Sequence, residues 1–356
     1  MNKILTVVIV MACLLVGCDK DDKQEEFDRK AMLSNMASGV IIPAIDDMNT
    51  ELSSLHTSAQ TFSGTPNQNN LDLLQASFEN AYRAFQYVKM FDFGPMMDYG
   101  IKASMNTYPT DTVEIESNIS IGSYNLTSAD MVDAIGFPAL DFLLFYQGDA
   151  AVMTSFTTAT NATNRLTYLT DLTSKMKDEF ALVVSGWDTY ETSFINADGN
   201  DSGSSTSLLF NEFVKDVELV KNAKIGIPAG EFSGGMPLPE YVEGKYSELS
   251  IELAIESLNG LKNAFNGGTG LGLDDYIIDV QGAEVESSLA QNINLQFDLC
   301  INKVNAIPNQ LSDQVSSNPT VVNEAYLELK KLVTMCKTDV SSTLGLLITF
   351  QDNDGD

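Results

Sequence analysis

Apolar residues recur at steps of three and four along much of this chain, which is the spacing that places them on one face of an α-helix. The first such stretch is residues 29–61, and a polar loop at 63–70 ends it. Its apolar positions are Met32, Met36, Val40, Ile41, Ile45, Met48, Leu52 and Leu55. The same period predicts further helices over residues 71–91, 164–195, 207–226, 245–266, 283–306 and 319–348. No strand ladder is evident, so the pattern predicts an all-α fold.

Two long connections interrupt the helical pattern. Residues 93–125 and 226–244 are rich in residues that break helices, and the first of them is expected to be irregular with room for a short strand. Loops of this length inside a compact domain are often functional. The helix count and the chain length fit two consecutive helical-bundle domains, over residues 27–150 and 151–356.

The N-terminus has the pattern of a secretory signal. Residues 1–18 carry a single lysine and then an apolar run that is too short to span a membrane as a mature helix. The run ends in Leu-Val-Gly-Cys, which resembles a bacterial lipobox and predicts lipidation of Cys18. The alternative is an ordinary signal peptide in which Cys18 is incidental. Residues 19–26 are mostly acidic and predict a solvated tether.

These features predict a cell-envelope protein that is lipid-anchored to the outer membrane. The acidic cluster after Cys18 resembles the surface-export signal of lipoproteins in Bacteroidetes-type bacteria, so the periplasmic face and the cell surface are both open. The mature chain would keep two cysteines, Cys300 and Cys336, which are equally compatible with one disulfide and with two buried thiols.

Charge and histidine content exclude several functions. Lys and Arg number 20 against 49 Asp and Glu, so the net charge of −29 repels nucleic acid and favours cations. The chain has one histidine, His56, predicted to lie on the surface near a helix end. A zinc site with two histidines is therefore excluded, and a Ser-His-Asp triad would have to use His56.

The stretch GFPALDFLLF, residues 136–145, carries the sharpest chemical signal. Asp141 is the only polar residue between Phe137 and Phe145, and an ionised carboxylate on an apolar helix is costly unless it is paired, hydrogen-bonded or bound to a cation. Gly136 and Pro138 predict a helix break that places Asp141 in the first turn of a helix.

Asp141 has two interpretations. In the first, the helix N-terminus stabilises the carboxylate, which pairs with Arg83, Lys89 or Lys102. In the second, the carboxylate holds a metal ion or a cationic group in a cleft between the two bundles.

Several segments of the chain resemble the imelysin-like proteins, and the resemblance runs from about residue 27 to the end. The matching segments are VIIPA (40–44), AFQYVKMFDFGP (84–95), YPTD (108–111), GFPALDFLLF (136–145), GKYSELS (244–250) and ITFQDNDGD (348–356). The resemblance implies an all-helical fold of two bundle-like domains, a cell-envelope location and an association with bacterial iron uptake. It also implies a possible peptidase activity, because the founding member was described as a metallopeptidase.

The chain departs from the family motif G-x-H-x-x-E. Gly136 fits the first position, but Pro138 stands in the histidine position and Asp141 in the glutamate position. Proline has no side-chain donor or acceptor, so the imidazole ligand is absent and a peptidase built on a His/Glu pair is not expected. In a second matching segment, Lys89 stands where many members have glutamate.

The residues predicted to form the site follow from this comparison. Asp141 would be its polar focus and the candidate metal ligand, and Gly136 and Pro138 would set the helix break that presents it. The neighbours predicted to pair with Asp141 or to contact a ligand are Arg83, Lys89 and Asp111.

The sequence thus predicts a non-catalytic envelope lipoprotein that takes part in the uptake of iron or of another metal or nutrient. Iron or another divalent metal is the candidate cofactor, and the expected partners are the membrane, a small ligand and other envelope uptake proteins. Two alternatives remain, which are a divergent metallopeptidase and an acidic scaffold or adhesin that recruits a protein partner.

Overall fold

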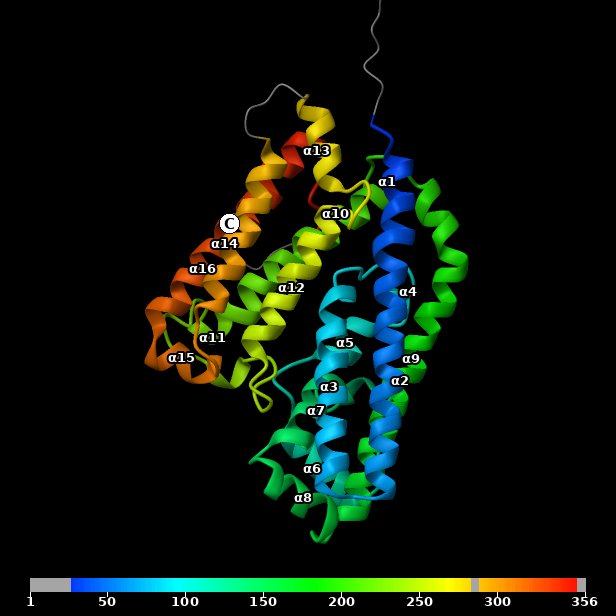
Figure 1. Cartoon of the computed structure of the whole chain (residues 1–356), viewed down its shortest axis with the longest axis vertical. Coiled ribbons are helices and arrows are strands. Elements are labelled where there is room, and N and C mark those ends of the chain that lie inside the picture. The colour runs from blue at the N-terminus through cyan, green and yellow to red at the C-terminus, as the bar shows by residue number, and fades with distance from the viewer. Residues whose placement is uncertain (1–26, 283–287, 351–356) are drawn as a thin grey trace, which may run out of the picture.

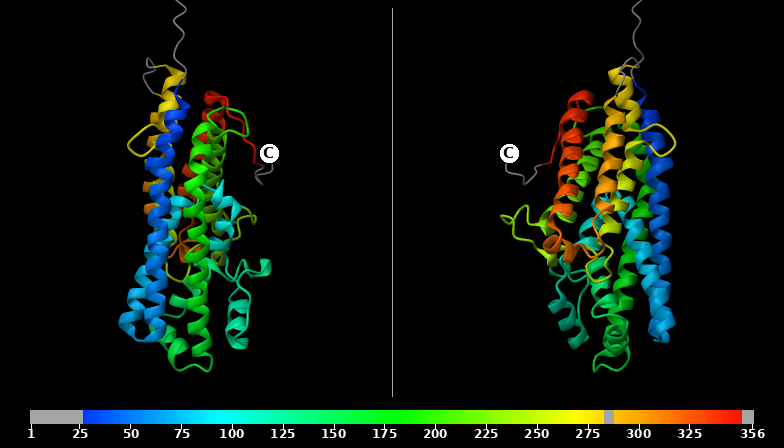
Figure 2. Two further views of the ribbon diagram at one scale, coloured as in Figure 1. Left: turned by 90° about the vertical axis from the view of Figure 1, so that its right-hand side faces the viewer. Right: turned by 60° about the vertical axis from the view of Figure 1, so that its left-hand side comes forward.

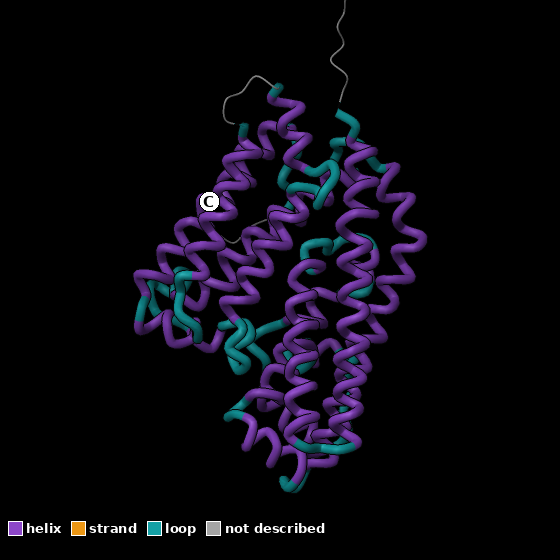
Figure 3. The backbone as a smooth tube through the Cα atoms, in the orientation of Figure 1, coloured by secondary structure: helices purple, strands orange, loops and turns teal. Residues whose placement is uncertain are grey.

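A computed structural model describes residues 27–282 and 288–350 of the chain. Within these residues every regular element is a helix and no strand is present, which confirms the predicted all-α fold (Figure 3). None of the described helices is long and apolar enough to cross a membrane. The predicted signal, Cys18, the tether and the last six residues of the chain lie outside the described residues.

The helices differ widely in length (Figure 1). The long ones are α2 (Ile42–Gly64), α3 (Gln68–Val88), α9 (Ala162–Asn196), α10 (Ser205–Leu219), α12 (Ser250–Phe265), α14 (Leu289–Asn305) and α16 (Pro319–Thr334). The short ones are α1 (Arg29–Asn35), α4 (Pro95–Asp98), α5 (Ile101–Asn106), α6 (Thr112–Ile121), α7 (Gly136–Phe145), α8 (Asp149–Thr157), α11 (Ile227–Ala229), α13 (Leu273–Gln281), α15 (Leu311–Ser317) and α17 (Ser341–Leu344). Three π-helical turns, η1 (Met36–Ile41), η3 (Val220–Gly226) and η5 (Met335–Val340), continue longer helices, and η2 (Ala129–Met131) and η4 (Pro239–Tyr241) are 3-10 turns.

The helices pack as two groups that lie side by side (Figures 1 and 2). The first group is built on α2, α3 and α9, and the second on α10, α12, α14 and α16, with α3 against α12 where the groups meet. Each apolar stripe is buried as its spacing predicts; on α3, Leu71, Leu74, Phe78 and Phe85 are fully buried. Burial of side chains of this size stabilises the fold by about 1.5–3 kcal/mol each.

The structure differs from the sequence prediction in its connections. The segment 93–125 holds three short helices, α4, α5 and α6, and no strand, and the short helices α8, α13 and α15 lie where no helix was predicted. These helices are too short to show a clear period. A side-chain cap marks the start of α6, where Asp111 accepts hydrogen bonds from the backbone N–H groups of Val113 and Glu114. The helix α9 follows the boundary predicted near residue 150, yet it packs against α2, so the first group runs on through Asn196.

Two further predictions concern single residues. Cys300 and Cys336 are free and buried, so the structure has the two thiols rather than the disulfide. His56 was expected at a helix end on the surface. It lies inside α2 and is only partly exposed, with its Nδ1 3.0 Å from the Thr173 hydroxyl on α9, and burial lowers the pKa of its imidazole. The helix continues to Gly64, which is why His56 meets a neighbouring helix.

Candidate functional site

A cavity of about 440 Å³ lies where the two groups of helices meet. Its walls come from α3, α5, the α10–η3 helix and the segment that follows α11. The lining residues include Phe85, Lys89, Lys102, Asn106, Tyr108, Asp216, Leu219, Ala223, Lys224, Ile227, Tyr241 and Glu243. Three lysines therefore share one space with two buried carboxylates.

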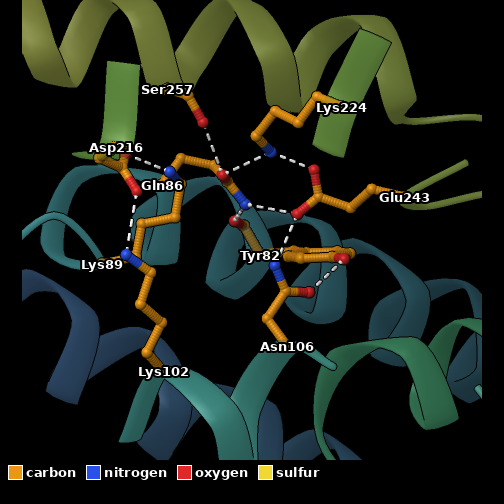
Figure 4. A network of polar contacts seen from close by, with 9 residues as sticks. All are labelled: Tyr82, Gln86, Lys89, Lys102, Asn106, Asp216, Lys224, Glu243 and Ser257. Carbon is orange, nitrogen blue, oxygen red and sulfur yellow. Dashed lines mark hydrogen bonds and ion pairs between the residues drawn. The ribbon is translucent and has the colours of Figure 1, made fainter. Parts of the chain in front are cut away.

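One face of α3 carries several of the polar side chains near this cavity (Figure 4). Tyr82, Gln86 and Lys89 are spaced by four and three residues, so they point the same way from the helix. All three are buried, and the helix face that they form points toward the second group of helices. Buried polar groups are costly unless they are hydrogen-bonded, so the second group must provide their partners.

Asp216 of α10 is the partner of Lys89. The ammonium group of Lys89 donates to Oδ2 of Asp216, and that of Lys102 lies 3.2 Å from Oδ1. The Asp216 side chain is fully buried, and the exposed fractions of the lysine side chains are 5% for Lys89 and 20% for Lys102. One carboxylate thus joins α3, α5 and α10.

Glu243 is the centre of a second set of contacts. Its Oε2 accepts from Lys224, and its Oε1 lies 2.7 Å from the Asn106 amide nitrogen. The Gln86 Oε1 accepts from Lys224 at 2.9 Å and from the Ser257 hydroxyl at 2.8 Å. The network therefore ties α3 and α5 to η3, α12 and the segment after η4.

A π-helical turn brings Asp216 and Lys224 into the same cavity. In a regular α-helix, residues eight positions apart point about 80° apart, because each residue turns the helix by about 100°. The π turn η3 contains Lys224 and accommodates an additional residue, which reduces the separation to about 20°. Both side chains consequently face α3.

The charges in this cluster shift one another's pKa. Burial lowers the pKa of Lys89 to about 8, with Lys224 and Lys102 adding to the effect and Asp216 opposing it. Burial also pushes the pKa of Asp216 upward, but the charges of Lys89 and Lys102 outweigh it and hold that pKa well below its usual range. At neutral pH the cluster is therefore an ionised carboxylate held by two ammonium groups.

Asp141 lies beside this cavity rather than in it. It lines a smaller pocket of about 120 Å³, with Pro138 and Lys245, and Tyr108 lines both spaces. Its two oxygens accept hydrogen bonds from the backbone N–H groups of Tyr246 (2.9 Å) and Ser247 (2.8 Å). Asp141 therefore anchors the turn that follows Glu243.

The expected pairing of Asp141 with a cation is wrong. Arg83 pairs with Glu79 and Glu252, and Lys89 and Lys102 pair with Asp216. Asp141 also lies beyond the first turn of α7, which begins at Gly136, so a loop rather than the helix N-terminus provides its donors.

The remaining predicted residues have local roles. Gly136 has φ = 75° and packs against the backbone of Ser104 and Met105, and Pro138 lies in the first turn of α7. Asp111 caps α6. Contact of Asp141, Gly136, Pro138, Arg83, Lys89 or Asp111 with a ligand stays a prediction.

The residues around Asp141 do not fit a metal. Proline at position 138 offers no ligand atom, and both Asp141 oxygens already accept backbone hydrogen bonds. Among residues 27–282 and 288–350, no group of three or more His, Cys, Asp or Glu side chains is placed to hold a metal ion. The geometry therefore does not favour the predicted metal role of Asp141.

The sequence pattern around Asp216 indicates a buried carboxylate, although Asp216 was not among the predicted site residues. Asp216 lies among Phe213, Val217 and Val220, which are all buried, so it is a carboxylate on an apolar helix face just as Asp141 is. Glu243 and Lys224 had no comparable signal, because one lies in an irregular segment and the other in a π turn.

The raised pKa of Asp141 makes a pH-dependent prediction. Burial raises this pKa from 3.8 to about 6, against the hydrogen bonds from Ser247 and Tyr246. The folded chain then binds the proton more tightly than the unfolded chain, so the contribution of Asp141 to stability is full below about pH 4 and is lost as the pH rises through about 6. Between about pH 4 and pH 7.5, the free energy of unfolding of the wild type minus that of Asp141→Asn should fall by about 2–3 kcal/mol, measured with urea.

The control for this experiment is Asp188→Asn, because Asp188 is an exposed carboxylate on α9. Its difference from the wild type should stay nearly constant over the same pH range. A constant difference for Asp141→Asn as well would show that burial does not raise the pKa of Asp141.

Comparisons with known proteins find similar sequences and similar arrangements of helices. A family model described as Imelysin matches residues 41–334. No curated protein matches the chain. A crystal structure described as an iron-regulated protein A precursor, from Parabacteroides distasonis ATCC 8503, is similar with a TM-score of 0.76 and 20% identity, over 90% of this chain and 95% of that chain. An imelysin-like protein from Psychrobacter arcticum 273-4 is similar with a TM-score of 0.74 and 18% identity, over 91% of this chain and 97% of that chain.

Proposed function

Because this chain belongs to the imelysin family, we propose that it is a non-catalytic binding protein of the cell envelope with a role in iron uptake. The cavity between the two groups of helices carries this proposal. It has the volume of a small-molecule site, and it combines an apolar wall with a few converging polar groups. The function proposed for the cavity is to hold a small ligand.

The iron-related role rests on the similarity of this chain to a solved structure. The similar structure from Parabacteroides distasonis is described as an iron-regulated protein A precursor. Regulation by iron is common among proteins that acquire iron, and an envelope protein with a ligand cavity suits such a system. Lipidation at Cys18 and attachment to the outer membrane are parts of the same proposal, with other envelope uptake proteins as partners.

The chemistry of the family motif supports a binding role over catalysis. Pro138 replaces the motif histidine and has neither a donor nor an acceptor in its side chain. Asp141 uses both carboxylate oxygens on the turn at Tyr246 and Ser247, so it is an anchor rather than a free base. A general base must reach the proton that it abstracts, and Asp141 is committed to backbone donors.

The proposal is tested in cells that lack this protein. Under iron limitation these cells should grow poorly and contain less iron, and the wild-type chain should restore both properties. Ala223→Phe places a large side chain in the cavity and should fail to restore them. The measurements are the growth rate and the cell-associated iron.

A matched control separates the cavity from the rest of the protein. Ala181→Phe makes the same change at an exposed position on α9 and should restore growth fully. Equal rescue by Ala223→Phe would show that the cavity is not used. Normal growth and iron content without the protein would overturn the iron-related role.

A further inference from the structure

The buried carboxylates of the cavity are already paired with donors of the protein. Each oxygen of Asp216 and of Glu243 already accepts a hydrogen bond from a side chain of the protein. These donors are Lys89, Lys102, Lys224 and Asn106. The third carboxylate that lines the cavity, Asp92, is paired with Lys215 at 3.8 Å. A ligand that offers only donors would share these acceptors with the side chains that already contact them.

Hydrogen-bond donors, in contrast, remain. The Lys102 ammonium group has three protons and donates one of them to Asp216, and its side chain is the more exposed of the two lysines on that carboxylate. Tyr108 also lines the cavity, and its hydroxyl makes no hydrogen bond to any residue in the described part of the chain. The cavity therefore presents donors, one of them charged, to whatever occupies it.

Part of the cavity wall is apolar. It is formed by Phe85 of α3, by Leu219 and Ala223 of the α10–η3 helix, and by Ile227. Burial of apolar ligand surface against these residues is favourable. A ligand that suits both the polar and the apolar residues has a polar head and an apolar body.

We propose that the cavity binds an organic anion, with a carboxylate or similar oxyanion head on the Lys102 ammonium and the Tyr108 hydroxyl. The apolar body lies against Phe85, Leu219 and Ile227. Charge-assisted hydrogen bonds to an oxyanion are about twice as strong as neutral ones, so the head group determines selectivity. This inference rests on the proposed function, because it specifies the ligand class of the same cavity.

The charges of the cavity also determine the form in which iron would bind there. A bare metal cation would meet the ammonium groups of Lys89, Lys102 and Lys224, and the carboxylates that could attract it are already paired. Iron in this cavity would therefore be part of a complex with an organic anion, which presents oxygen atoms and negative charge to the lysines.

The test compares two probes of the same size, naphthoate and naphthamide. They share the ring and differ in the charge of the head, and a calorimetric titration measures both. The protein is a soluble form that starts after Cys18 and keeps every described residue. Naphthoate should bind at one site and at least about tenfold more tightly than naphthamide. Lys102→Met should remove this preference, and Tyr108→Phe should reduce it.

Two controls separate the possible failures. Lys262→Met removes a partly exposed lysine that pairs with Asp298 and does not line the cavity, and it should leave both affinities unchanged. Ala223→Phe should abolish binding of both probes. Equal affinity for the two probes, with loss of both in Ala223→Phe, would overturn the anion preference while the cavity remains a binding site. Absence of binding by either probe would count against both proposals.

Discussion

Replacing Asp216 with alanine is expected to lower the free energy of unfolding by about 3–5 kcal/mol, because the change leaves Lys89 buried without the carboxylate that stabilises its charged form. Lys89 is only 4% exposed, and Asp216 is its sole carboxylate partner among the described residues. Lys102 loses the same partner. Urea unfolding near neutral pH measures the loss.

The expected loss has a clear pH dependence. The pKa of folded Asp216 lies below that of the unfolded chain, because the charges of Lys89 and Lys102 outweigh its burial. Its contribution to stability is therefore present above the unfolded pKa of about 4 and is lost as the pH falls toward about 2. The wild type and Asp216→Ala should converge in stability over this acid range.

Two variants test the cause of the loss. Asp298→Ala breaks an exposed ion pair with Lys262 and should cost less than about 1 kcal/mol. The double variant Lys89→Met/Asp216→Leu replaces both buried charges with apolar side chains and should recover most of the stability. A cost below 1 kcal/mol for Asp216→Ala would show that the buried pair does not stabilise the fold.

Replacing Gly136 with alanine is expected to cost about 3 kcal/mol or more, from two separate causes. Gly136 has φ = 75°, and a residue with a Cβ pays about 1–2 kcal/mol in that left-handed region. The added Cβ would also lie 2.3 Å from the backbone oxygen of Met105 and 2.8 Å from that of Ser104. Backbone cannot rotate away as a side chain can, so α5 and α7 must move apart, at a further cost of about 1–3 kcal/mol.

Gly148 provides the matched control, because it shares the first cause and lacks the second. It has φ = 80°, and nothing lies within 4 Å of a Cβ built there. Gly148→Ala should cost about 1–3 kcal/mol from its backbone conformation alone, and thermal unfolding of both variants measures the difference. Equal losses in the two variants would show that the contact between Gly136 and α5 does not contribute.

The long helices were predictable because the relevant interactions are local. In residues 29–61, eight apolar side chains repeat on one face, and the observed helix runs through α1, η1 and α2 from Arg29 to Gly64. The π turn inside it was not predicted, and neither were α6 and α15, since ten residues or fewer give too few repeats to detect. For such short helices, caps and packing decide the conformation.

The sequence predicted the burial of Asp141 in the candidate site but not the groups that it contacts. The apolar neighbours of Asp141 correctly indicated that its carboxylate is buried, since the helical period alone determines the face on which it lies. They could not indicate its partners, which are backbone N–H groups 105 and 106 residues later in the chain. A backbone donor leaves no mark in the sequence, because every residue except proline has one.

The sequence by itself therefore determined the helical class, the buried faces and the presence of a buried charge. Only the tertiary structure decided which charges meet: Lys89 pairs with Asp216 across 127 residues of sequence, and Lys224 reaches Gln86 across 138. The physical reason is the range of the interactions. Helix periodicity acts over three or four residues, whereas a buried ion pair depends on the packing of helices that are distant in the chain.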